Sequence, residues 1–304
     1  MRRTVAVVLI ALGVFCLVLA PMMRLWMASS LMKTPLDYYN ATVNTGEITY
    51  FNIEDVEQVE DASVEAHSTL RADVASSTDD VVVWDQFTWI KDADTDFGIS
   101  SNSRRAGHDR VTGEAVDCCD AMVNEERLTQ SGQLWKFPFM TEQRDYDFFE
   151  TTVGEVVPME FQGVEEVDGV EAYKFVQTVE PTVVDQREIP REVAGLEGEG
   201  DVVGDETFSI VRSYWVEPTS GTPINISEDH HLVVVVDGEE VLTLLSGELE
   251  FDDATRAASI ENTEQARTVL PLLHTTLPLA ALITGVGFIG IAVVLLVTGR
   301  RTGA

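Results

Sequence analysis

The hydrophobic pattern of this chain is dominated by two apolar runs, one near each end. Residues 277–297 carry no charged side chain. A helix of that length, at about 1.5 Å per residue, spans a hydrocarbon core of roughly 30 Å. Residues 5–26 form a second apolar run behind Arg2 and Arg3. Because this run is longer than the core of a cleaved signal peptide and does not end in small residues, we expect an uncleaved anchor.

Basic residues at the chain ends predict the topology. Arg2 and Arg3 precede the first apolar run, and Arg300 and Arg301 follow the last. Since basic residues next to a span tend to stay in the cytoplasm, we expect cytoplasmic termini and a two-span protein of the cytoplasmic membrane. The expected parts are an anchor at 1–27, an extracytoplasmic body at 28–274, a transmembrane helix at 275–298 and a cytoplasmic tail at 299–304.

The body between the spans has the period-two pattern of β-strands. Residues 208–216 alternate between two sets of side chains, and residues 232–236 are continuously apolar. Asp-Gly pairs at 168–169 and 237–238 lie between such runs and predict tight hairpin turns. We therefore expect a mainly antiparallel β (α+β) extracytoplasmic domain, flanked by an N-terminal and a C-terminal transmembrane helix.

Two segments of the body have a helical pattern instead. They are residues 118–128 and the stretch from Asp253 to about Leu270. The second, counted as 253–274, is expected to continue into the C-terminal span as one rod.

A faint internal repeat relates the two halves of the body, 28–150 and 151–252. The triplet at 64–66 recurs at 170–172, and an aromatic strand ending in Trp89 has a counterpart ending in Trp215. Short strands resemble one another by chance, so the repeat leaves two alternatives open. One is a duplicated curved-sheet unit, and the other is a single sheet without internal symmetry.

Acidic residues outnumber basic ones by 52 to 20, which gives a formal net charge of −32. Such a surface repels nucleic acid and anionic headgroups, so nucleic acid is excluded as a partner. The few lysines and many carboxylates are typical of a salt-adapted protein, and a high-GC genome that favours arginine explains them equally well.

No motif of catalysis or cofactor binding occurs in the sequence. It contains no phosphate-binding glycine loop, no His-Glu-x-x-His, no Gly-x-Ser-x-Gly and no Cys-x-x-Cys. His230 and His231 are adjacent on a strand and therefore face opposite ways, which disfavours a shared metal ion. His108 with Asp109 is a weaker metal candidate. We expect a non-enzyme without catalytic, cofactor-binding or metal-binding residues.

Two further features are candidate modification sites. Cys118 and Cys119 are adjacent in the expected extracytoplasmic body, where thiols tend to oxidise. They could form a vicinal disulfide, remain as two thiols or bridge to a partner. Asn40 and Asn225 begin sequons for N-glycosylation, which matter only if the organism glycosylates.

Several segments together resemble the porin PorA family, which is known mainly from actinobacterial envelope proteins and whose molecular function is unknown. The similarity covers essentially the whole chain in order, and it implies a place in the cell envelope without implying any catalytic residue. The segments that carry it are Lys33–Asp37, Arg110–Cys119, Trp135–Phe139, Tyr146–Phe149, Tyr214–Pro218 with Gly221, and the final helix with its span.

The family name by itself does not establish that the protein forms a pore. A porin barrel turns an apolar face to lipid, whereas Asp and Glu interrupt many of the expected strands. A pore-forming protein is therefore the least favoured interpretation.

The favoured interpretation is a non-catalytic, membrane-anchored envelope protein whose β domain binds a lipid or glycolipid. The hairpin at 214–224 resembles one found in periplasmic lipoprotein carriers of the curved-sheet type, and Trp89 and Trp215 are the candidate apolar ligand surface. Plain core packing is the alternative role for each tryptophan. The alternative function is a structural or sensory ectodomain that binds envelope polymer or other envelope proteins.

Overall fold

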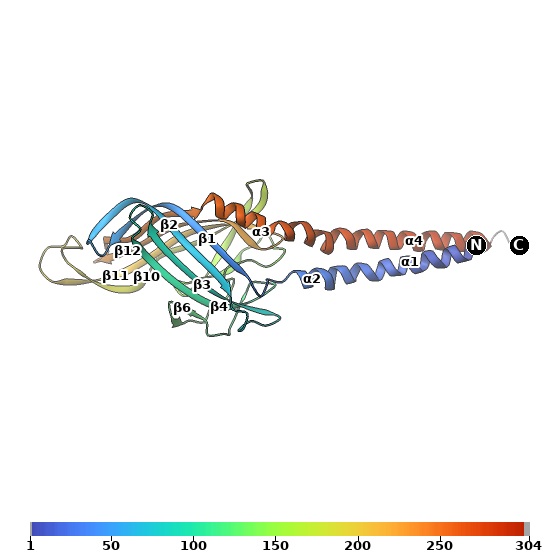
Figure 1. Cartoon of the computed structure of the whole chain (residues 1–304), viewed down its shortest axis with the longest axis horizontal. Coiled ribbons are helices and arrows are strands. Elements are labelled where there is room, and N and C mark those ends of the chain that lie inside the picture. Colours follow the sequence, from blue (N-terminus) through green and yellow to red (C-terminus); the bar gives the residue numbers. More distant parts are fainter. Residues whose placement is uncertain (1, 301–304) are drawn as a thin grey trace. The chain divides into compact units, whose positions relative to one another are not determined.

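The computed structural model describes residues 2–300 (Figure 1). The chain divides into two compact units. One consists of Met1–Lys33 and Glu264–Ala304, and the other of Thr34–Thr263. The first unit is helical and the second is built around a β-sheet.

Two stretches are long and apolar enough to cross a membrane, Arg2–Met27 and Asp253–Thr298, and the second begins within the β unit. The first stretch ends in a short π-helix, and another short π-helix interrupts the second. The N-terminal stretch consists of α1 (Arg2–Met22) and η1 (Met23–Met27), and α2 (Ala28–Leu31) follows it. The C-terminal helices are α3 (Asp253–Pro271), η2 (Leu272–Thr276) and α4 (Leu277–Arg300).

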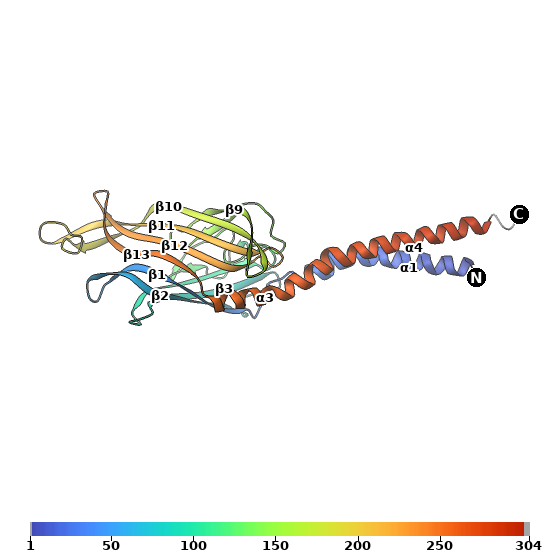
Figure 2. The same ribbon diagram turned by 90° about the horizontal axis from the view of Figure 1, so that it is seen from above.

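A seam of small residues joins α1 to α4. The buried positions Ala6, Gly13 and Ala20 recur every seven residues on α1. Pro278, Gly285 and Ala292 do the same on α4. A Cβ at Gly13 would lie only 2.9 Å from the Gly285 carbonyl oxygen, so glycine allows the two backbones to approach closely. The helices run antiparallel, so the start of α1 and the end of α4 lie at the same end of the pair (Figure 2).

The β unit is a single antiparallel sheet of thirteen strands within residues 34–263. Its order is β7-β6-β4-β3-β2-β1-β13-β12-β11-β10-β9-β8, with β5 paired to β4. The first and last long strands, β1 and β13, are therefore neighbours at its centre. The strands are β1 (Tyr39–Asn52), β2 (Glu57–Ala72), β3 (Val81–Asp92), β4 (Gly98–Asp109), β5 (Ala115–Val116), β6 (Met122–Val123), β7 (Glu126–Arg127), β8 (Tyr146–Glu150), β9 (Glu155–Val167), β10 (Val170–Pro190), β11 (Asp201–Glu217), β12 (Thr222–Val236) and β13 (Glu239–Phe251).

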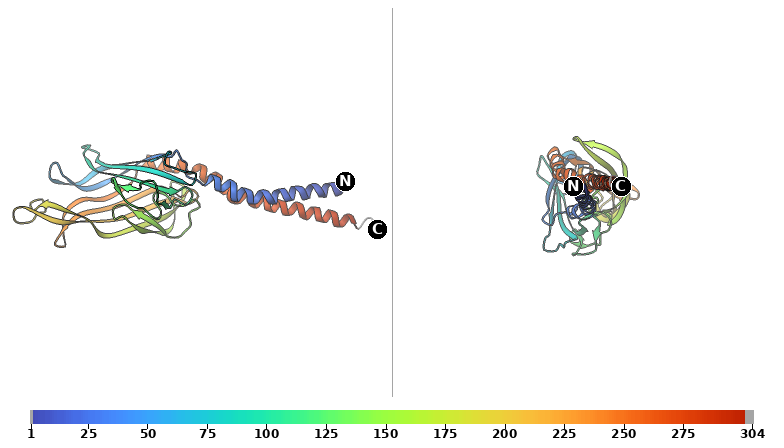
Figure 3. Two further views of the ribbon diagram at one scale, coloured as in Figure 1. Left: turned by 90° about the horizontal axis from the view of Figure 1, so that it is seen from below. Right: turned by 90° about the vertical axis from the view of Figure 1, so that its right-hand side faces the viewer.

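The sheet is strongly curled (Figure 3), and an irregular segment bridges its two ends. Gln133, in the segment between β7 and β8, forms an antiparallel bridge with Glu114 and a parallel bridge with Phe148 of β8. Glu114 directly precedes β5, which pairs with β4. Backbone hydrogen bonds therefore continue from β4 through Gln133 to β8, and the curled sheet has a distinct inner face.

The inner face carries the core. Ile48, Tyr50, Phe148, Phe175 and Ile210 all point to it and are almost completely buried. The outer face is mostly polar and bears ion pairs such as Arg105–Asp85 and Lys174–Glu165. The expected hairpins are also present, with both residues of Asp168-Gly169 and of Asp237-Gly238 at positive φ. The prediction of a mainly antiparallel β domain is confirmed.

The predicted helix over 118–128 is wrong. The segment contains turns and the short strands β6 and β7. Cys119, Asp120, Asn124 and Glu125 all adopt positive φ, which an α-helix does not allow. The sequence pattern did not reveal that these backbone positions are left-handed.

The predicted helix from Asp253 is confirmed as α3, which runs through η2 into α4. Asp252 accepts the Thr255 backbone N–H at 2.7 Å and thereby caps the helix N-terminus. Ile260 packs against Val170 and Ile224, so the first turns of α3 cover part of the outer face of the sheet.

The triplets of the proposed repeat do not occupy equivalent places. Val64 and Ala66 belong to the inner-face core. Val170 and Ala172 lie on the outer face, under Ile260 of α3. A one-residue difference in strand register reverses the face of every side chain, which is why a similar triplet can serve two different environments.

Candidate functional site

A charged network crosses the inner face of β10, β11 and β12. Arg212 donates to Glu228 Oε1 at 2.5 Å and to Gln177 Oε1 at 2.7 Å, and it lies 3.7 Å from Glu150. Burial opposes ionisation of Glu228, yet the charge of Arg212 and the His230 ring, with Nε2 3.7 Å from the carboxylate, hold the pKa of Glu228 well below its ordinary value. This network is therefore charged at neutral pH, and its members compensate one another.

A second inner-face group is cationic and poorly compensated. Arg104 donates from Nε to Gln130 at 2.8 Å, and its guanidinium carbon lies 4.3 Å from the ring centre of Trp135. Lys136 Nζ lies 3.8 Å from the ring centre of Phe139. Burial lowers the pKa of Arg104 to about 9 and that of Lys136 to about 7. Aromatic faces rather than carboxylates contact both cations.

His108 and Trp84 complete this group, which we call the cationic interior (Trp84, Arg104, His108 and Lys136, with Trp135). His108 Nδ1 lies 2.9 Å from the Asp109 carbonyl oxygen, so Nδ1 carries the proton and Nε2 is left as an acceptor. Its ring meets Trp84 edge-on at 4.5 Å, and burial lowers the pKa of His108 to about 4. The imidazole is therefore neutral at physiological pH.

Four polar atoms of the cationic interior have no hydrogen-bond partner. They are Trp84 Nε1, Arg104 Nη2, His108 Nε2 and Lys136 Nζ, among the six such buried atoms found within residues 2–300. Buried polar groups are normally satisfied, so atoms of this kind mark a place that can accept water or an anion. The group offers no nucleophile beside a general base, and within residues 2–300 no three His, Cys, Asp or Glu residues gather closely enough to hold a metal ion.

The segments that resemble the porin family meet next to this interior. Phe137 N donates to the Gly221 carbonyl at 2.8 Å, and Thr141 N donates to the Pro218 carbonyl at 2.7 Å. Gly221 has φ +71°, and a Cβ there would lie 2.5 Å from the Pro138 carbonyl oxygen. Only glycine fits this contact, so the 135–141 segment and the 217–221 turn are held together where the curled sheet closes.

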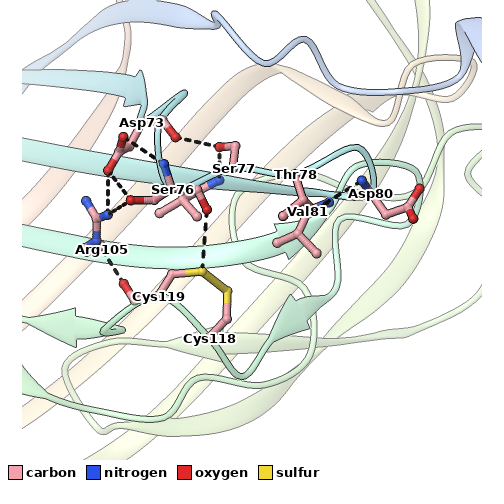
Figure 4. The surroundings of a disulfide bond; sticks show 10 residues. Asp73, Ser76, Ser77, Thr78, Asp80, Val81, Arg105, Cys118 and Cys119 are labelled. Atoms are coloured by element: carbon pink, nitrogen blue, oxygen red, sulfur yellow. Dashed lines mark hydrogen bonds and ion pairs between the residues drawn. A yellow bond between two sulfur atoms is a disulfide. The ribbon is translucent and has the colours of Figure 1, made fainter.

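Cys118 and Cys119 form a disulfide with each other, with Cα atoms 3.7 Å apart (Figure 4). The bonded pair lies on the outer face of β4, above Gly107. A Cβ at Gly107 would lie 2.5 Å from Cys118 Sγ, so the glycine provides the space for the sulfur atoms. Cys16, in α1, is a free cysteine.

Trp89 and Trp215 do not form one ligand surface. Both point outward, but they lie on β3 and β11, and four strands separate these in the sheet order. Trp89 stacks on His67 at 4.9 Å. Trp215 donates to Glu165 at 2.6 Å and lies under Lys174. Trp89 also stacks on Phe87, and Trp215 packs against Val170 and Ile224, so each tryptophan has its own set of neighbours.

The two sequon asparagines have different environments. Asn225 is only 5% exposed and donates from Nδ2 to Glu250 at 2.7 Å. A glycan attaches through that nitrogen, so the folded protein disfavours modification of Asn225. Asn40 lies partly exposed on β1, and its glycosylation stays a prediction.

The two histidines of the 230–231 pair face opposite sides of β12, as expected. His230 points inward, and His231 Nδ1 lies 3.1 Å from Ser246 Oγ on the outer face. A groove of about 360 Å³ runs along this outer surface, with Ser209, Asp229 and His231 in its lining.

Sequence reasoning missed Arg104, Arg212 and Glu228. The sequence did contain a signal for Arg212. It lies two residues from both Ile210 and Tyr214, on the face of the strand that is otherwise apolar. A charge in the core phase of a strand indicates a buried polar partner. Arg104 has no such signal, because its strand shows no clear alternation.

The family model described as "Porin PorA" matches residues 5–294 of the chain. A curated protein named "Porin PorA" from Corynebacterium resistens is 23% identical over 215 residues, which cover 50% of this chain and 52% of the relative. Another of that name, from Corynebacterium amycolatum, is 27% identical over 159 residues, covering 43% and 41%. The chain thus spans about half the length of the curated relatives it matches.

This finding overturns the preference for a non-pore protein that handles lipid, because the relatives are named as porins. The charge pattern of the strands argues only against a barrel whose strands face lipid, and it does not bear on a pore formed in another way. By a match over nearly its whole length, the chain belongs to the porin PorA family.

Proposed function

We propose that this protein is a non-catalytic, pore-forming protein of the cell envelope in which the terminal helices, from several copies of the chain, surround the pore. The observation that carries the proposal is the family match over residues 5–294, which covers nearly all of both apolar helical stretches. The names of the relatives supply the activity, and the helices supply the means of crossing a membrane.

The polar outer face of the sheet supports a pore that crosses the membrane with helices and not with strands. A strand that crosses a bilayer turns apolar side chains to lipid, whereas the outer face of this sheet carries ion pairs such as Arg105–Asp85. Helices satisfy their own backbone hydrogen bonds and are tolerated in lipid. One copy contributes only α1 and α4, which pack tightly on each other through Gly13 and Gly285. A water-filled path therefore needs further copies.

The charge of the protein predicts the selectivity of the pore. With a net charge of −32, the polar unit raises the local concentration of cations near the membrane surface and lowers that of anions. We propose that the β unit lies outside the cytoplasmic membrane and that cations pass in preference to anions. The preference should weaken at high ionic strength, because salt screens the surface charge.

The test is conductance of the full-length protein in a planar lipid bilayer, with a KCl gradient across it. We expect discrete conductance steps and a reversal potential that indicates cation permeation. Gly13→Leu should abolish the steps, because a side chain at Gly13 collides with Ile289 and with the Gly285 carbonyl. Gly98→Leu is the matched control, since nothing lies within 4 Å of a Cβ at Gly98. Absence of steps in the wild-type protein, or wild-type steps in the Gly13→Leu protein, would refute a pore formed by the helices.

A further inference from the structure

The vicinal disulfide Cys118–Cys119 is seated between β4 and a neighbouring loop. Gly107 lies beneath it on β4, and Val81 Cγ1 lies 3.2 Å from the place that a Gly107 Cβ would take. The sulfur atoms therefore have no room to move toward the sheet. On their other side, Cys119 Sγ lies 4.0 Å from the Ser76 carbonyl oxygen (Figure 4).

Ser76 belongs to the β2–β3 loop at residues 73–80, which we call the 73–80 loop. Asp73 organises this loop by accepting the Ala75 and Ser76 backbone N–H groups. Arg105 joins the loop to the disulfide, because it donates to Asp73 at 2.7 Å and to the Cys119 carbonyl at 3.0 Å. The turn that contains the cysteines and the 73–80 loop therefore share one side chain as well as a direct contact.

The C-terminal end of the 73–80 loop binds Arg110 through hydrogen bonds. The Asp80 carbonyl accepts the Arg110 backbone N–H at 2.9 Å, and the Asp79 carbonyl accepts from Arg110 Nη1 at 2.8 Å. Arg110 in turn donates from Nε to the Thr34 carbonyl at 2.7 Å, and Thr34 N donates back to the Arg110 carbonyl at 2.8 Å. Thr34 is the first residue of the β unit. A continuous set of contacts thus leads from the disulfide to the point where the chain enters this unit.

We propose that Cys118–Cys119 is a redox-sensitive latch, which holds the 73–80 loop and Thr34 in place when oxidised and releases them when reduced. The inference goes beyond the proposed pore function and does not rest on it. Two thiols must separate farther than two bonded sulfur atoms. Since Gly107 and Val81 block movement toward β4, the reduced side chains move against Ser76 and displace the loop.

The reductant is an external dithiol. One of its thiolates attacks a sulfur of the pair, so the Cys118–Cys119 bond breaks and a mixed disulfide forms. Its second thiol then displaces the cysteine. Two electrons and two protons pass to the cysteines, and the dithiol becomes a disulfide. Both cysteines are partly exposed, so such a reagent can reach them.

Hydrogen exchange of the full-length protein tests the latch. In a Cys16→Ser background, peptides covering 73–81 and the Thr34 amide should exchange about tenfold faster after treatment with dithiothreitol than before it, as expected for local opening. Peptides from β11 and β12, on the far side of the sheet order, should not change. The triple variant Cys16→Ser/Cys118→Ser/Cys119→Ser should exchange like the reduced protein and should not respond to dithiothreitol.

Two outcomes would overturn the inference. If residues 73–81 exchange at one rate in both redox states, the disulfide only shapes its own turn. If every strand loses protection on reduction, the bond is a general staple of the fold and not a local latch. Mass measurement of the alkylated protein shows in each case that reduction took place.

Discussion

At the scale of single residues, the inner face of the sheet contains buried charges of two kinds, one paired and the other unpaired. Arg212 has carboxylates on two sides, at Glu228 and Glu150, and Gln177 Oε1 accepts a hydrogen bond from it. Lys136 has no hydrogen-bond partner and contacts the Phe139 ring instead. A buried charge is tolerated when it is paired and is costly when it is not, so the cost of burial is compensated at Arg212 and uncompensated at Lys136.

Lys136 should therefore make stability depend on pH. Its folded-state pKa of about 7 lies below the ordinary value of 10.5, so the unfolded chain binds more protons between these two values. The free energy of unfolding should rise as pH increases from about 7 to 10.5, because folding releases the Lys136 proton in this range and that release costs less as pH rises. Lys136→Met should raise the free energy of unfolding at neutral pH by about 1–3 kcal/mol and flatten this rise.

Urea unfolding at several pH values, followed by tryptophan fluorescence, measures this effect. Lys174→Met is the matched control, because the Lys174 ammonium is paired with Glu165 on the outer face. A Lys136→Met protein that is less stable than the wild type at neutral pH would show that the ammonium has a partner the structure does not contain.

Gly221 is a second position where one residue decides a larger arrangement. Gly221→Ala adds a methyl group that overlaps the Pro138 carbonyl oxygen and also strains a backbone at φ +71°. We expect a loss of about 3 kcal/mol in the free energy of unfolding. Gly238→Ala shares the positive φ, at +85°, but has nothing within 4 Å. It should cost only about 1 kcal/mol. Equal losses in the two variants would mean that the contact with the 135–139 segment contributes nothing.

At the scale of elements, the sequence predicts those whose pattern is local. The strands at 208–216 and 232–236 have period-two alternation or a continuous apolar run, and the Asp-Gly turns have a known backbone requirement. The helix from Asp253 begins at a capping aspartate. These signals lie within a few residues of the feature they specify.

The remaining features depend on contacts between distant segments. The closure of the sheet depends on Gln133, which lies in no regular element, and its bridges to Glu114 and Phe148 join three separate segments. The cationic interior combines β3, β4 and the 135–139 segment in the same way. Helical periodicity in residues 118–128 was misleading, since the disulfide and four left-handed residues fix another conformation. The residue pattern within a short stretch of sequence contains no information about contacts between distant segments.

At the scale of the whole molecule, the chain combines an acidic β unit with an antiparallel pair of apolar helices. The seam formed by Ala6, Gly13 and Ala20 faces that formed by Gly285 and Ala292, so α1 and α4 behave as a preformed hairpin. A hairpin inserted in a membrane places both of its free ends on one side and the intervening residues on the other. The basic residues at the chain ends favour the cytoplasm for the free ends.

This orientation can be tested by cysteine labelling in intact cells, in a Cys16→Ser background with Cys118 and Cys119 kept oxidised. Glu197→Cys places a thiol in the exposed loop between β10 and β11, and Ala304→Cys places one at the C-terminus. A membrane-impermeant maleimide should label Glu197→Cys in intact cells, and it should label Ala304→Cys only after the membrane is opened with detergent. The detergent sample controls for intrinsic reactivity, because both thiols must react there. Labelling of Ala304→Cys in intact cells would refute the two-span orientation. That result would also place the acidic β unit on the cytoplasmic side. The unit would then concentrate cations at the cytoplasmic mouth of the pore and not at the outer one.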